Sequence, residues 1–156
     1  MNYPKIVLQK GKEVSLLRKH HWVFSGAIAK GTEGLKNGDL VAVHSSKNDF
    51  LGIGHFSQGS IMVRIISFEE RAIDLAFWVE KLTAAYAVRI ALQLTDQKDT
   101  TVYRLVHGEG DGLPGLIIDY YQGTAVIQAH NLGMHQHLAE IAEGLKVVYG
   151  KKLKGV

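Results

Sequence analysis

The chain has 156 residues, of which 46% are hydrophobic and 21% charged, and its formal net charge at pH 7 is +3. This composition is that of a globular protein with one domain or two small ones, and it argues against wholesale disorder. The absence of cysteine excludes a disulfide scaffold, a thiolate metal site and any mechanism with a cysteine nucleophile. No signal peptide or bilayer-spanning stretch of roughly 20 apolar residues is recognisable, so we expect a soluble cytoplasmic protein.

The charge is unevenly distributed along the chain. Residues 1–72 carry ten Lys and Arg against six Asp and Glu, and residues 73–145 carry four against nine. The last eleven residues carry four lysines and no acidic residue. A basic block favours a polyanionic partner such as RNA, although an excess of this size is common in proteins that bind no nucleic acid.

Short strands and tight turns dominate the first 70 residues. The pattern predicts a strand over residues 5–10, two helical turns over 12–19, and further strands over 39–44, 50–55 and 61–68. The last of these is almost continuously apolar, which is typical of a strand buried on both faces. We therefore expect a small barrel-like β domain.

The apolar period changes to 3.6 residues from residue 73 onwards. It predicts a long helix to about Leu94, and a polar exit over residues 96–99 follows. The apolar positions expected on the buried side of this helix are Leu75, Phe77, Trp78, Val79, Leu82, Tyr86, Val88 and Ile90. Strands over 102–107, 116–120 and 124–128 and a helix from about 134 to 145 complete a helix, three strands and a helix. The fold class is therefore α+β.

The apparent catalytic and cofactor motifs lack the neighbouring secondary structure or partner residues that their chemistry requires. Residues 110–115 match G-x-G-x-x-G, but a dinucleotide loop opens a helix, and here a strand-like segment follows. Glu109, Asp111 and Asp119 could be imagined as paired catalytic carboxylates, yet acidic residues beside turn glycines are more often structural. His135 and His137 lie two apart on a predicted helix and point to different faces. We predict no catalytic, cofactor-binding or metal site.

One basic segment has the composition of a nucleic-acid interface. Lys10, Lys12, Arg18, Lys19 and His20 precede Trp22 and Phe24. Cations neutralise phosphates, and aromatic rings stack on unpaired bases. If the segment is extended, Trp22 and Phe24 share one face, and we expect at least one of them to lie in the core.

Two long motifs carry a resemblance to a known family. Residues 10–28 are KGKEVSLLRKHHWVFSGAI, and residues 103–119 are YRLVHGEGDGLPGLIID. Together they resemble the bacterial S-adenosylmethionine-dependent cytosine-C5 methyltransferases that act on large-subunit ribosomal RNA. His21 departs from the proline usual in that family, which would loosen the approach to Trp22.

The resemblance implies an RNA-binding PUA domain over residues 1–70 and a truncated central α/β domain over 71–156. The family's S-adenosylmethionine domain and its catalytic cysteine would be missing, so this chain would bind RNA, hold no cofactor and be inactive alone. The side chains that would contact phosphates are Lys10, Lys12, Arg18 and Lys19, and those that would contact bases are His20 and Trp22. The alternative is a protein-interaction module without RNA affinity, forming a homodimer through an open edge of the incomplete central domain.

Overall fold

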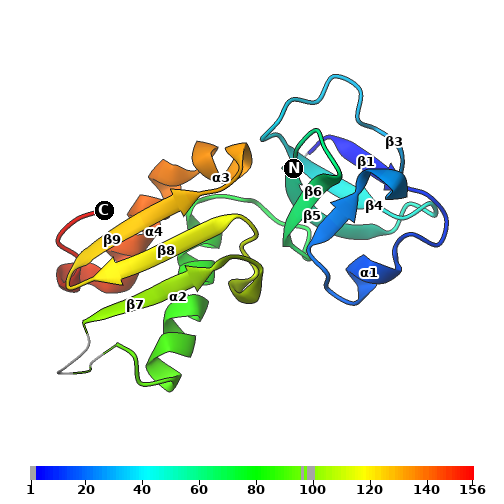
Figure 1. Cartoon of the computed structure of the whole chain (residues 1–156). Coiled ribbons are helices and arrows are strands. Elements are labelled where there is room, and N and C mark those ends of the chain that lie inside the picture. The colour runs from blue at the N-terminus through cyan, green and yellow to red at the C-terminus, as the bar shows by residue number, and fades with distance from the viewer. Residues whose placement is uncertain (1–2, 96, 98–100) are drawn as a thin grey trace. The chain divides into compact units, whose positions relative to one another are not determined.

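The computed structural model describes residues 3–95, 97 and 101–156. The chain divides into two compact units, Met1–Ala72 and Ile73–Val156, each of which is described by itself (Figure 1). The polar exit predicted at 96–99 lies, apart from Gln97, outside the described residues.

A curled six-stranded sheet forms the first unit (Figure 1). Its strand order is β2-β6-β5-β4-β1-β3, and all neighbours are antiparallel except β1 and β4. The strands are β1 (Lys5–Leu8), β2 (Trp22–Phe24), β3 (Ile28–Lys30), β4 (Leu40–His44), β5 (Phe50–Phe56) and β6 (Ile61–Ser67). The short helix α1 (Val14–Leu17) follows β1, and the 3-10 turn η1 (Ser25–Ala27) follows β2.

One face of the curled sheet encloses the core of the first unit. Alternate residues of β1 and β4, Ile6, Leu8, Val41 and Val43, are at most 1% exposed. Leu16 of α1 is buried in the same cluster. Gly31 lets the chain turn beside β1, because its φ is +97° and a Cβ there would collide with the backbone oxygen of Lys5.

Helices and a three-stranded antiparallel sheet make the second unit. The sheet order is β7-β8-β9, with β7 at Val102–His107, β8 at Leu116–Tyr121 and β9 at Thr124–Ala129. The helices are α2 (Leu75–Ala91), α3 (Leu132–Gln136) and α4 (Leu138–Tyr149), with 3-10 turns η2 (Gly108–Asp111) and η3 (Gly150–Lys152). Together the two units confirm the predicted α+β class.

Helix α2 packs against α4 and β7. Asp74 caps its N-terminus by accepting a 3.0 Å hydrogen bond from the amide of Phe77. Gly144 of α4 permits close packing, since a Cβ there would come within 2.9 Å of Cδ1 of Leu82. Behind the sheet, the hydroxyls of Tyr103 and Tyr149 are 2.8 Å apart, and burial raises the pKa of Tyr149.

Three details of the predicted elements are wrong. The buried side of α2 contains Phe77, Trp78, Leu82, Ala85 and Arg89. The predicted core positions Leu75, Val88 and Ile90 are instead 42%, 48% and 51% exposed. Arg89 takes the core-facing position because its guanidinium forms hydrogen bonds with partners on β7 and η2.

The single helix expected over 134–145 is two helices that meet at His137. Strands β2 and β3 were not predicted as strands.

Candidate nucleic-acid interface

Strand β2 presents its two aromatic residues away from the core. Because neighbouring residues of a strand point to opposite faces, Val23 turns inward and is 2% exposed. Trp22 is half-buried and Phe24 is 49% exposed. The two rings share one face as predicted, but the expectation that one of them lies in the core is wrong, because Val23 occupies the core position.

His20, Trp22 and Phe24 form a continuous row of rings, here called the aromatic row. His20 and Trp22 meet edge to face with centroids 5.6 Å apart, and Trp22 and Phe24 do so at 6.2 Å. The backbone N–H of Trp22 donates to Nδ1 of His20 at 3.2 Å, so a neutral His20 carries its proton on Nε2. The aromatic row therefore offers stacking faces and a ring N–H donor on one side of β2.

The connection between α1 and β2 is anchored on β6 and the residue that follows it. Nζ of Lys19 lies 4.7 Å from the ring centroid of Phe68, a cation–π contact. Nδ1 of His21 donates to the carbonyl of Ile65 at 2.7 Å, and Ile65 N donates back to His21 O at 2.7 Å. His21 is therefore held on β6 by both its ring and its backbone, and the looser approach expected relative to proline stays a prediction.

The remaining predicted phosphate-binding residues flank α1. Lys10 and Lys12 lie in the turn before the helix and Arg18 is its C-cap, and all three are exposed. Buried Leu16 holds the helix on the core, so its polar neighbours face solvent.

Sequence reasoning missed two residues of this surface. Arg64 of β6 is the register partner of Trp22, so the two side chains lie on the same face of the sheet. Phe68 supplies the ring under Lys19. Both are at least 40 residues from β2 in sequence, and the only available signal was a single arginine in the otherwise apolar segment 61–66.

Asp111 and Asp119, two of the three acidic residues considered as catalytic carboxylates, have structural roles, as predicted. Nη2 of Arg89 donates to Oδ2 of Asp111 at 2.8 Å, and a second bond joins Nη1 to Oδ1. Arg104 holds Asp119 with bonds of 2.8 and 3.1 Å, and this hydrogen-bonded pairing raises the pKa of Arg104. Carboxylates paired in this way are not poised for acid–base chemistry.

The glycine-rich segment lacks the geometry of a dinucleotide-binding loop. It contains η2 and a turn at Gly112, whose φ is +70°, and it leads into strand β8 and not into a helix. A loop of this kind has no helix N-terminus to offer a pyrophosphate. The prediction that residues 110–115 form a reversal between strands is confirmed.

No metal site is found either, within the described ranges. No group of three or more His, Cys, Asp or Glu side chains in them could hold a metal ion. His135 lies in α3, whereas His137 lies between α3 and α4, so the expectation that they share a helix is wrong. Among the described helices, none is both long enough and apolar enough to span a membrane.

The comparison with family models defines the class of the first unit. Residues 6–68 match the model described as a PUA-like domain. The first unit of the structure therefore contains a PUA-like domain, and this part of the resemblance is confirmed.

Curated relatives extend the similarity to the whole chain. The chain is 38% identical over 151 residues to ribosomal RNA large subunit methyltransferase I of Salmonella arizonae, covering 95% of this chain and 37% of the relative. With the protein of the same name from Erwinia tasmaniensis the identity is 37% over 147 residues, covering 93% and 37%. The chain is thus homologous to these methyltransferases and spans little more than a third of their length.

Solved structures show the same fold. A candidate SAM-dependent methyltransferase from Streptococcus mutans superposes with a TM-score of 0.80 at 22% identity, covering 97% of this chain and 39% of that one. A candidate methyltransferase in complex with SAH gives the same values. The arrangement of strands and helices described above is therefore one already seen in such proteins.

Proposed function

We propose that this chain binds ribosomal RNA and serves as the RNA-recognition part of a SAM-dependent methyltransferase acting on C5 of cytosine in large-subunit RNA. Residues 1–70 would form the RNA-binding PUA domain and residues 71–156 the central domain. The 156 residues contain no cysteine to attack the base. Methyl transfer and binding of the methyl donor would therefore depend on residues other than these 156. The protein would act in the cytoplasm, where ribosomes are made.

The observation that carries this proposal is the aromatic row beside exposed cations. Unpaired bases can stack on Trp22 and Phe24, which β2 holds on the outer face of the sheet. Lys10, Lys12, Arg18 and Lys19 would contact phosphates, and His20 and Trp22 would contact bases. Arg64, the register partner of Trp22, adds a cation on the same face.

The test is an electrophoretic mobility shift with fragments of large-subunit ribosomal RNA at increasing salt concentration. We expect binding at micromolar protein that weakens steeply with salt, because phosphate neutralisation releases condensed counterions. Absence of binding at micromolar protein, or binding insensitive to salt, would contradict the proposal.

A second candidate function is self-association through the second unit. Strand β9 is an edge of its sheet, and on its outer side the described residues place only a bridge from Thr124 to Gly155. A groove of about 580 Å³ beside it is lined mainly by apolar residues, and Val126 is 43% exposed. An open edge of this kind can pair with a second copy. Light scattering over a range of concentrations distinguishes the two: a tight dimer without RNA affinity favours this candidate.

A further inference from the structure

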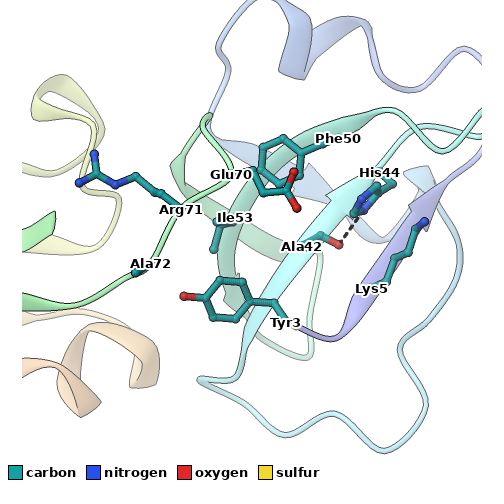
Figure 2. A pocket seen from close by; sticks show the side chains of 9 residues that line it. All are labelled: Tyr3, Lys5, Ala42, His44, Phe50, Ile53, Glu70, Arg71 and Ala72. Atoms are coloured by element: carbon teal, nitrogen blue, oxygen red, sulfur yellow. Dashed lines mark hydrogen bonds between the residues drawn. The ribbon is translucent and has the colours of Figure 1, made fainter. Parts of the chain in front are cut away.

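The first unit contains a pocket that neither the sequence motifs nor the relatives point to. It has a volume of about 390 Å³, within the range of small-molecule sites (Figure 2). Strands β1, β4 and β5 and the segment at residues 70–72 line it, and all its residues belong to the first unit.

The pocket opens on the sheet face opposite the hydrophobic core. Lys5, Ala42 and Ile53 are register partners across β1, β4 and β5, whereas their neighbours Ile6 and Val43 point into the core. Ile53 is fully buried and gives the pocket an apolar floor. Trp22 of the aromatic row is also opposite the core, because its neighbour Val23 points inward.

Aromatic rings and a carboxylate line the pocket walls. Phe50 meets His44 edge to face at 5.7 Å, and Tyr3 supplies a further ring. Figure 2 shows the carboxylate of Glu70 directed toward the strand that carries Ala42 and His44, whereas the guanidinium of Arg71 points away from the pocket. The planar faces suit a flat ligand, and the carboxylate suits a ligand with N–H donors.

His44 adds a neutral polar group. Burial and then the positive charge of Lys5 lower the pKa of His44 below its ordinary value of 6.5. Its Nδ1 lies 3.4 Å from the carbonyl oxygen of Ala42, which can only accept, so Nδ1 carries the proton and Nε2 keeps its lone pair. The imidazole of His44 therefore lies in the same pocket lining as the side chains of Lys5 and Glu70.

We propose that this pocket holds the base of an unpaired guanosine in RNA. Guanine is the common base whose pairing edge presents two adjacent donors, N1–H and N2–H, to which the Glu70 carboxylate can accept two charge-assisted hydrogen bonds. Adenine and cytosine place a ring-nitrogen lone pair beside a single amino group, and a carboxylate repels that lone pair. Uracil offers one N–H between two carbonyl oxygens. The pocket therefore selects guanine, while Lys5 lies within the site for O6 or the phosphate.

This inference rests on the proposed RNA binding and adds a second point of contact to it. In the sheet order, β4 is three strands from β2, or about 14 Å along the sheet at ~4.8 Å per strand. A single strand of RNA whose bases stack on the aromatic row can thus place a nearby base in the pocket. A free guanine nucleotide would present the same chemistry without the second contact.

The first experiment titrates the full chain with GMP, AMP, CMP and UMP and follows backbone amide signals by NMR. We expect the tightest binding for GMP, with shifts centred on Lys5, His44, Phe50 and Glu70. Glu70→Gln should weaken GMP binding about tenfold, the worth of one charge-assisted hydrogen bond. Glu69→Gln is the matched control, because that neighbouring side chain is 82% exposed and outside the pocket, and it should change nothing.

The second experiment compares GMP with a uridine oligonucleotide that contains one guanosine. The oligonucleotide should bind more tightly than GMP, and Lys12→Ala/Arg18→Ala/Lys19→Ala should weaken the oligonucleotide while leaving GMP binding unchanged. Equal affinity for the four nucleotides, equal effects of the Glu69 and Glu70 variants, or shifts away from the pocket would overturn the guanine site. If the affinity for GMP equalled the affinity for the oligonucleotide, the proposal that the bound guanine belongs to RNA would be overturned. Loss of RNA binding with retained GMP binding would overturn the proposed function and RNA as the source of the base, and would leave only a site for a free guanine nucleotide.

Discussion

Arg89 of α2 and Asp111 of η2 form a two-point ion pair in which the side chains are only 10% and 8% exposed. Nε of Arg89 also donates to the carbonyl of Arg104 at 2.8 Å, and Asp111 accepts from the amide of His107 at 2.6 Å. The pair therefore ties the glycine-rich loop and β7 to the helix behind them. It also explains why a charged residue occupies the buried side of α2.

Replacing Asp111 with Asn should strongly destabilise the second unit. The variant keeps the shape of the side chain but leaves the guanidinium of Arg89 without its countercharge, a loss worth about 3–5 kcal/mol for a buried pair. Urea unfolding followed by circular dichroism measures the change in the free energy of unfolding. Glu143→Gln is the control, because it breaks an exposed pair with Lys146 and should cost at most about 1 kcal/mol. Equal costs for the two variants would contradict the structural role of the Arg89–Asp111 pair.

Stability should fall in mild acid because of His137. Burial lowers the pKa of His137 below 6.5, and the carboxylate of Glu140, 3.8 Å away, opposes that shift. The unfolded chain therefore takes up the proton first, so this contribution is complete above pH 6.5 and is lost as the pH falls below it. His44 shifts in the same direction and adds to the effect.

His137→Gln isolates this contribution. The free energy of unfolding measured between pH 8 and pH 5 should fall less in the variant than in the unmodified chain. The ring of His137 packs at 5.1 Å from that of Trp78, so the variant is also expected to be less stable at pH 8. An unchanged pH dependence would contradict the burial of a neutral His137.

Trp22 should report RNA binding by its fluorescence. The chain has two tryptophans, and Trp78 is fully buried in the second unit. Stacking of a base on Trp22 should quench its emission, and Trp22→Phe should abolish this quenching. Trp22→Ala should cost about 1–3 kcal/mol in affinity for single-stranded RNA. Tyr121→Ala, which removes a 46% exposed ring from the second unit, should leave the affinity unchanged. Quenching that persists in Trp22→Phe would exclude Trp22 as the stacking residue.

The parts of the fold that the sequence predicted are those set by local signals. Strands β7, β8 and β9 follow apolar runs bounded by turn residues, and they were placed to within one residue at each end. Strand β2 has only three residues and exists because it pairs with β6, 37 positions or more along the chain. Periodicity within one segment cannot reveal a partner at that distance. The same holds for Arg89, whose burial depends on Asp111.

The candidate site was predictable in composition but not in geometry. The cations of the 10–22 segment were recognised from their residue types, and the structure exposes them. The inward position of Val23, the ring of Phe68 under Lys19 and the alignment of Arg64 with Trp22 all depend on sheet pairing. The pocket at Glu70 combines four separate segments of the first unit, so no single motif could indicate it.

Whether the surface around α1 and β2 binds RNA is best decided by the salt dependence of binding. The measurement compares the unmodified chain with two triple variants that lose the same charge. One is Lys12→Ala/Arg18→Ala/Lys19→Ala, and the other is Lys30→Ala/Lys36→Ala/Lys47→Ala, whose lysines are exposed elsewhere on the first unit. The first variant should bind more weakly, and the slope of log K against log salt concentration should fall by about two. The second should keep nearly the original slope, and equal losses in both variants would contradict an RNA interface at α1 and β2.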